Sequence, residues 1–121
     1  VSRTPPRVSG VGGLMATLTD CTALLRGRRW DVRFVMRLPD GAHGEIDSVD
    51  NPCKQIRIAL DQSPESMLDT LLHECLHACV PDLAEEAVDE TASDIARLLC
   101  RYGLTIDTVA MRKALADRKA T

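Results

Sequence analysis

The segment 63–79 constrains the fold most, because its pattern predicts a long amphipathic helix. Ser63 is a favourable N-cap, Pro64 suits the first helical position, and Glu65 places an acid in the first turn. Apolar residues then recur at helical spacing, at Met67, Leu68, Leu71, Leu72, Cys75, Leu76 and Cys79. Such a stripe is buried against other elements, so the chain must supply a sheet or further helices to cover it.

The segments before this helix predict a small sheet. Apolar and polar residues alternate over 30–38 and again over 55–60, which is typical of half-buried strands. Gly44–Asp47 is a candidate short edge strand. Nearer the N-terminus, apolar residues at helical spacing predict a helix over 14–25. The interpretation is an α+β fold, with a small antiparallel or mixed sheet of two to four strands packed on helices.

A second helix is expected to follow and to run antiparallel to the first. Val80-Pro81 interrupts the first helix, and Asp82 is suited to cap the next one, which should end near Gly103. Its expected buried face consists of Ala84, Val88, Thr91, Ile95, Leu98 and Leu99. Asp107 is expected to begin a shorter terminal helix.

The length of 121 residues fits one domain. Residues 1–13 are rich in Pro, Gly and Ser and are expected to form a flexible leader, with a single domain over 14–121. No apolar run approaches the ~20 residues that a membrane span needs. Polar residues also interrupt any apolar region of a signal peptide, so the expectation is a cytoplasmic protein with no membrane partner.

Charge and cysteine content narrow the classes of function. Residues 41–99 hold three Lys or Arg against thirteen Asp or Glu. Because contact with phosphates needs basic residues, no nucleic-acid partner is expected, whereas a cation is plausible there. The five cysteines are scattered and odd in number, which argues against a disulfide framework. Cys75 and Cys79 share a helix face with leucines and are interpreted as buried thiols rather than metal ligands.

The motif His73-Glu74-Cys75-Leu76-His77 carries the chemistry, because it has the pattern H-E-x-x-H. Two His residues four apart on a helix lie on one face, so both imidazoles can reach one ion. Glu74 projects to the side, where it can hydrogen-bond a water held by that ion. On a helical wheel the two His residues lie nearly opposite the centre of the leucine stripe, so they should face a cleft.

The segment from about Gln55 to Arg101 resembles the core of the zincin-like metallopeptidases. It is similar in particular to the small SprT-like and ImmA/IrrE-like gluzincin domains, including short ones encoded by bacteriophages. The resemblance implies that His73 and His77 are zinc ligands, that Glu74 is the general base, and that an acidic or His residue on the next helix is the third ligand. The gap between the motif and any such residue is shorter here than in larger gluzincins.

The third ligand must be a carboxylate, because no His follows His77. Residues just after Pro81 should lie level with His77 in a tight hairpin, which favours Glu85. A rival is Glu90 followed by Asp94, which resembles the ligand and outer-shell pair of larger gluzincins. The remaining acidic candidates are Glu86 and Asp89.

These features predict a Zn²⁺-dependent metallopeptidase, in a bacterial or phage-infected host cell, that hydrolyses a peptide or protein substrate. A zinc-bound water activated by Glu74 would attack the amide. His43 and Tyr102 are the candidate oxyanion donors, and by resemblance Gly44–Asp47 would pair with the substrate. The alternatives are a zincin-fold protein that keeps metal for structure or assembly, and a helical interaction module without metal. The oligomeric state stays open.

Overall fold

Residues 14–120, which the computed structural model describes, form three α-helices, a four-stranded mixed sheet and a separate pair of parallel strands. This arrangement confirms the predicted α+β class. The leader expected over 1–13 lies outside the described residues. None of the helices in the described part combines the length and the apolar character that crossing a bilayer requires.

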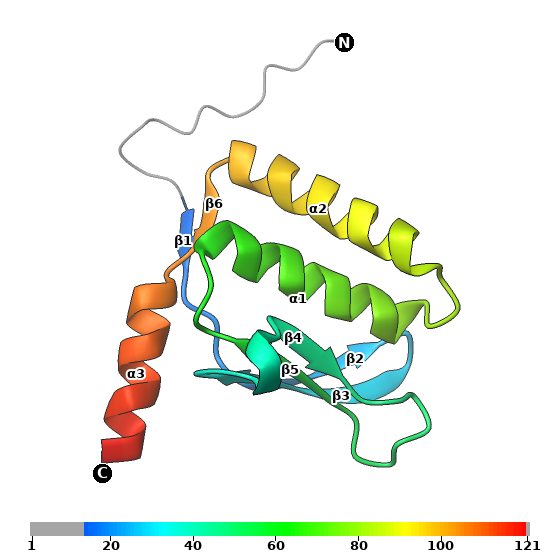
Figure 1. The fold of residues 1–121 in the computed structure, drawn as a ribbon, viewed down its shortest axis with the longest axis horizontal. Coiled ribbons are helices and arrows are strands. Elements are labelled where there is room, and N and C mark those ends of the chain that lie inside the picture. Colours follow the sequence, from blue (N-terminus) through cyan, green and yellow to red (C-terminus); the bar gives the residue numbers. More distant parts are fainter. Residues whose placement is uncertain (1–13, 121) are drawn as a thin grey trace.

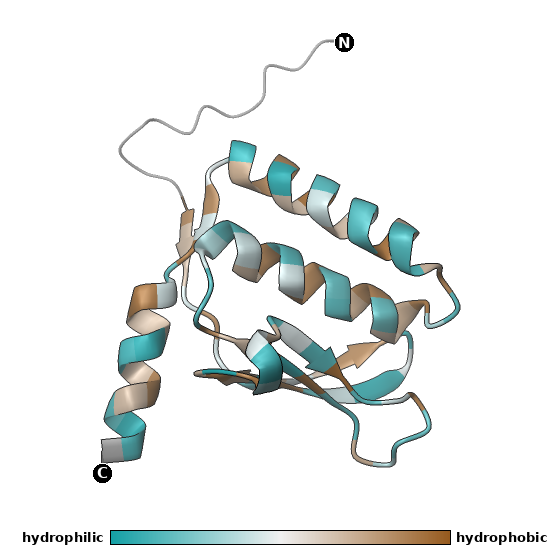
Figure 2. Cartoon of the chain, in the orientation of Figure 1, coloured by the Kyte–Doolittle hydropathy of each residue, from teal (hydrophilic) through white to brown (hydrophobic). Residues whose placement is uncertain are grey.

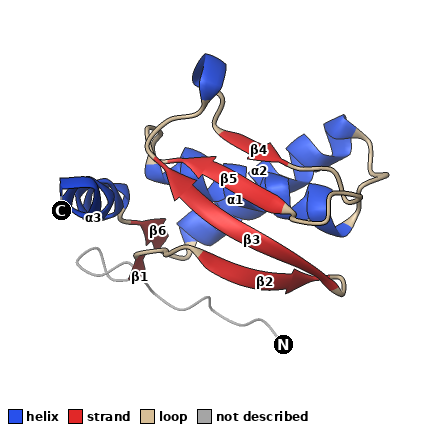
Figure 3. Cartoon of the chain, turned by 90° about the horizontal axis from the view of Figure 1, so that it is seen from below, coloured by secondary structure: helices blue, strands red, loops and turns tan. Residues whose placement is uncertain are grey.

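The four-stranded sheet supplies the surface on which the site is built (Figure 3). Its order is β2-β3-β5-β4, with β3 and β5 parallel and the outer pairs antiparallel. The register places apolar residues of β3 and β5 side by side, with Val32 opposite Ile56 and Phe34 opposite Ile58. The strands run over Cys21–Leu25 (β2), Arg28–Val35 (β3), Gly44–Ile46 (β4) and Gln55–Ala59 (β5). The alternation predicted two strands and an edge strand at these positions, and all three predictions are confirmed.

The helix predicted over 14–25 is wrong, because this segment forms β1 (Leu14–Ala16) and β2. The turn between β2 and β3 explains the error. Arg26 and Gly27 both adopt positive φ, 48° and 77°, which is the geometry of a two-residue hairpin turn. This turn pairs β2 with β3, and the pairing overrides a helical spacing that rested on few residues.

Two of the three helices lie on one face of the sheet and form two further layers (Figure 1). Helix α1 (Pro64–Cys79) packs directly on the strands, and α2 (Glu85–Arg101) packs antiparallel on α1. After α2, β6 (Leu104–Ile106) pairs in parallel with β1, and α3 (Thr108–Ala120) follows to one side. A short 3₁₀ turn, Pro39–Gly41, connects β3 with β4.

Helix α1 begins as its sequence predicts. The Ser63 hydroxyl accepts a hydrogen bond from the backbone N–H of Ser66, at 3.2 Å, and Pro64 occupies the first turn. The helix buries Met67 and Leu68 against the strands. Figure 2 shows polar and apolar residues interspersed along both α1 and α2, so each helix has covered and exposed surfaces.

Helix α2 departs from the prediction at its start and in its buried face. Its N-cap is Ala84, without a side-chain cap, so the capping role predicted for Asp82 is wrong. Asp82 instead lies within the turn that the hydrogen bond from Leu83 N to Val80 O closes. The buried residues are the small ones, Val88, Ala92 and Ala96, whereas Ile95, Leu98, Ala84 and Thr91 are not fully covered. Close packing of α2 on α1 selects small side chains over the larger ones that periodicity favoured.

An ion-pair network holds the edge strand β4 in place over α1. The Arg57 guanidinium on β5 contacts Glu45 at 3.0 Å and Asp47 at 2.8 Å. Its hydrogen bond to Asp47 lowers the pKa of that carboxyl, and the pKa of Arg57 is raised in return. These ion pairs anchor β4 to the sheet beside the candidate site.

Candidate metal centre

A polar seam joins α1 to α2 and positions the candidate site. Residues one turn apart on α1 meet residues one turn apart on α2, in reverse order because the helices are antiparallel. From the open end of the hairpin toward its turn, the pairs are Asp69 with Ser93, His73 with Asp89, and His77 with Glu85. The seam therefore brings both histidines of the motif beside acidic residues of the first turns of α2.

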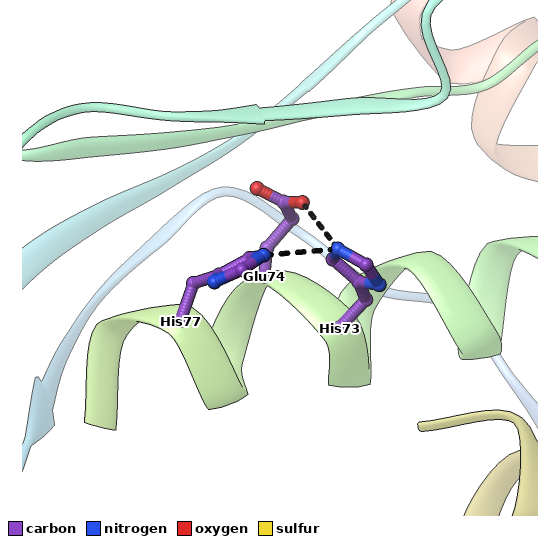
Figure 4. A group of neighbouring side chains, drawn as sticks. All are labelled: His73, Glu74 and His77. Atoms are coloured by element: carbon purple, nitrogen blue, oxygen red, sulfur yellow. Dashed lines mark hydrogen bonds and ion pairs between the residues drawn. The ribbon is translucent and has the colours of Figure 1, made fainter. Parts of the chain in front are cut away.

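His73, His77 and Glu85 lie beside one another across the hairpin. The two Nε2 atoms lie 3.0 Å apart, and each lies 3.1 Å from a different oxygen of the Glu85 carboxylate. Figure 4 shows the two imidazoles turned toward each other above the helix. Ligand atoms about 2.05 Å from a tetrahedral zinc are about 3.3 Å from one another, so these separations are close to those of a zinc ligand set.

Glu74 lies on the sheet side of the histidines and is buried. Figure 4 shows its side chain rising from α1 toward the strands. One oxygen, Oε1, lies 3.8 Å from His73 Nε2, while Oε2 is buried without a hydrogen-bond partner. Loss of solvent raises the pKa of this carboxyl, and the nearby His73 and His77 partly offset the rise. A buried unpartnered carboxylate is costly, which is typical of a functional group rather than a structural one.

Gly44 allows β4 to lie this close to Glu74. A Cβ atom at this position would meet Thr70 Cγ2 at 2.6 Å and Glu74 Cγ at 3.1 Å. The first distance is shorter than any ordinary contact, so a larger residue would push the strand from the helix. Glycine thus lets the edge strand lie against Glu74.

The donor set fits a divalent cation. Two groups in the described part of the chain bring three possible ligand atoms within 4.8 Å of one another: His73 with Glu74 and His77, and His73 with Glu85 and Asp89. Imidazole nitrogens with a carboxylate are the ligands that catalytic zinc sites use. Without a cation, these converging groups leave Glu74 Oε2 unpartnered, and a cation with bound solvent would relieve that cost.

Asp89 has a role that the sequence interpretation missed, since it was considered only as a ligand. Its Oδ1 lies 3.1 Å from His73 Nδ1, the ring nitrogen that faces away from Glu85. A carboxylate there is placed to accept the Nδ1 proton, which leaves a lone pair on Nε2 for a metal. Its position four residues after Glu85, and so on the same face of α2, was the available signal.

We expect the Asp89→Asn variant to bind zinc about 10- to 100-fold more weakly than the parent, the range found when outer-shell partners are replaced. An amide orients the ring less strongly than a carboxylate and removes a negative charge near the ion. Competition with a chelating dye measures the affinity. Glu90→Gln is the matched control, because this neighbouring carboxylate is exposed and does not face the histidines. Equal losses in both variants would contradict an orienting role for Asp89.

The other candidate ligands and oxyanion donors lie outside the proposed ligand set. Glu86 and Glu90 are exposed, and Asp94 pairs with Arg97 at 3.0 Å. Tyr102 lies at the far end of α2, about 25 Å along the helix from Glu85 at 1.5 Å per residue. His43 lies in a hollow next to Glu74.

Cys75 is free and half-buried, and no cysteine joins the two ligand groups of the described chain. Burial raises the pKa of its thiol to about 11. Since the thiolate is the form that ligates metals, this thiol behaves as a small apolar side chain.

Comparison with known proteins finds no match for this chain among family models, curated proteins or solved structures. The functional interpretation therefore depends on the motif and on the geometry of the site.

Proposed function

We propose that the protein is a zinc-dependent peptidase whose metal is held by His73, His77 and Glu85. One observation carries the proposal. Side chains from two helices converge to a ligand-like set, and the buried, unpartnered carboxylate of Glu74 stands beside them. This combination is what metal-assisted hydrolysis requires, namely a Lewis acid and a base next to it.

Zinc and Glu74 would have separate roles in the reaction. Bound zinc would lower the pKa of its water toward ~7 and polarise the substrate carbonyl. Glu74 would accept a proton from the attacking water as its oxygen bonds to the carbonyl carbon. It would then deliver that proton to the amine nitrogen as the C–N bond breaks.

The shape of the surrounding surface supports a peptide or protein substrate. β4 is an edge strand of its sheet, so one side of its backbone can pair with an extended chain. A hollow of about 320 Å³ lies between β4 and the polar face of α1, and both Glu74 and His73 line it. A peptide beside β4 would thus pass the proposed metal. Action inside a bacterial or phage-infected cell is part of this proposal and rests on the resemblance of the motif alone.

A second candidate function is a metal-stabilised structural or assembly protein. It is favoured by the position of Glu85 and His77 on either side of the turn between α1 and α2, where a cation would cross-link the hairpin. Peptide hydrolysis would distinguish the peptidase from the structural protein. Bound metal would distinguish both of them from a helical interaction module without metal.

The test is elemental analysis of the untagged protein together with peptide hydrolysis. We expect about one zinc per chain, loss of both zinc and hydrolysis on chelation, and recovery of both on adding zinc. Zinc without cleavage of any peptide in a broad library would favour the structural role. Absence of zinc after supplementation would exclude both metal-based functions.

A further inference from the structure

The side chains that line the hollow beside Glu74 are polar. Apart from His73 and Glu74, the residues that line it are Ser66, Asp69 and Thr70 on α1, with His43 and Gly44 at β4. None of these has an apolar side chain larger than the threonine methyl. A hollow of this kind has little to offer an apolar ligand, so the orientation of its polar groups decides what it can bind.

Gln62 fixes the orientation of these polar groups through its hydrogen bonds. Its side chain is mostly buried, and Nε2 donates to Ala59 O at 2.7 Å and to His43 O at 3.2 Å. Two carbonyl acceptors on the same nitrogen leave the amide one orientation. Its Oε1 must therefore act as an acceptor on the side that faces α1.

This amide oxygen accepts a hydrogen bond from each of two neighbouring hydroxyl groups. Ser66 Oγ donates to Gln62 Oε1 at 2.6 Å, and Thr70 Oγ1 donates to it at 2.9 Å. Each hydroxyl has only one proton, so only lone pairs remain to face the hollow. His43 Nδ1 lies 3.4 Å from Ser66 Oγ, which can accept a hydrogen bond from it when the Nδ1 proton is present.

Two carboxyl groups, those of Asp69 and Glu74, also line this wall. Ser93 Oγ on α2 holds Asp69 by donating to Oδ2 at 2.8 Å, while Asp69 Oδ1 makes no hydrogen bond or ion pair within the described chain. At the inner end, the Glu74 side chain is only 8% exposed, and its Oε2 has no partner. The hollow therefore presents the lone pairs of Ser66 and Thr70 together with two carboxylate oxygens that have no partner within the described chain, Asp69 Oδ1 and Glu74 Oε2.

We propose that this hollow is the subsite for a lysine or arginine side chain of the substrate, with Asp69 as the residue that determines this specificity. The assignment rests on the proposed peptidase function. An ammonium or guanidinium group supplies only donors and a positive charge, and so complements the oxygens of Ser66, Asp69 and Thr70. An acidic side chain would meet like charges, and an apolar one would leave the acceptors unpaired. Glu74, at the boundary with the metal centre, remains available for the proton.

The test uses the zinc-loaded full chain and two blocked octapeptides that differ only in a central lysine or norleucine. Affinity is measured from the shifts of the ¹⁵N-amide signals of Asp69 and Thr70, and kcat/KM is measured in parallel. We expect the lysine peptide to bind about tenfold more tightly, as a charge-assisted hydrogen bond would give. Asp69→Asn should abolish that preference while keeping the Ser93 hydrogen bond. Glu86→Gln, with the same charge change at an exposed position, should retain it.

Each outcome bears on one of the two proposals. Equal affinity for both peptides, or a preference that survives in Asp69→Asn, overturns the basic subsite even where hydrolysis is observed. A preference for lysine that depends on Asp69, without cleavage, supports the subsite and overturns the peptidase. If Asp69→Asn does not fold, as judged by circular dichroism, Thr70→Val replaces it. This variant should lose about threefold in lysine-peptide affinity and nothing for norleucine, as expected for one weakened acceptor contact.

Discussion

Replacing Glu74 by Gln should lower kcat/KM for peptide hydrolysis by about 10²- to 10⁴-fold while zinc stays bound. The amide has the shape of the carboxylate but cannot accept a proton at neutral pH. The fold should be retained, because a neutral amide is less costly to bury than the unpartnered carboxylate now there. Hydrolysis of a fluorogenic peptide, zinc content and the thermal midpoint together measure the three expectations.

Glu86→Gln is the matched control for this variant. It makes the same chemical change on an exposed surface of α2, and should leave kcat/KM within twofold of the parent, as expected for an uncoupled surface site. A Glu74→Gln variant that cleaves as fast as the parent would exclude Glu74 as the base. A variant that loses zinc as well as activity would indicate that Glu74 helps to hold the ion.

His77→Ala should weaken zinc binding by more than about 100-fold, beyond the range for outer-shell partners, because it removes a direct ligand. His73 and Glu85 alone would leave the ion with two protein ligands, fewer than either structural or catalytic zinc sites use. Competition with a chelating dye measures the affinity, and hydrolysis should fall with zinc occupancy.

The control for His77→Ala is His43→Ala. His43 is the third histidine of the chain and lies in the hollow outside the ligand groups, so its removal should leave zinc affinity unchanged. Equal affinities for zinc in His77→Ala and the parent would remove His77 from the proposed ligand set.

The spacing of the motif predicted much of the candidate site. Residues four apart on a helix must share a face, so the convergence of His73 and His77 depends only on α1 being helical. The nearness of Glu85 also followed from sequence, because a short turn between antiparallel helices places residues on either side of it level with each other. That these side chains bind metal is a prediction, which zinc content and zinc affinity measure.

The burial of Glu74 and the polarity of the hollow could not be predicted in the same way. Both depend on how closely β4 approaches α1, and that approach is set by Gly44, which lies thirty residues earlier in the chain. The role of Gln62 was also hidden, since it requires the carbonyls of His43 and Ala59 to meet at one point. Such long-range placements leave no local pattern in the sequence.

The errors in the fold prediction have a common cause. The segment 14–25 has a weak helical pattern, but its pairing with β3 through the Arg26–Gly27 turn decides its structure. Ile95 and Leu98 were predicted to be buried from their helical spacing, yet the buried residues of α2 are Val88, Ala92 and Ala96. In both cases tertiary contacts overrode a local preference. Strong local signals, such as the Ser63-Pro64 start of α1, were confirmed.

The uncapped start of α2 has a consequence for how the chain would take up and release an ion. Glu85 is the first residue of that helix, and no side chain satisfies the free amides around it. Without a side-chain cap, this first turn should fray more readily than a capped helix start would. Fraying of a single turn would withdraw one ligand and leave the two imidazoles in place, so exchange of the ion would need no opening of the core.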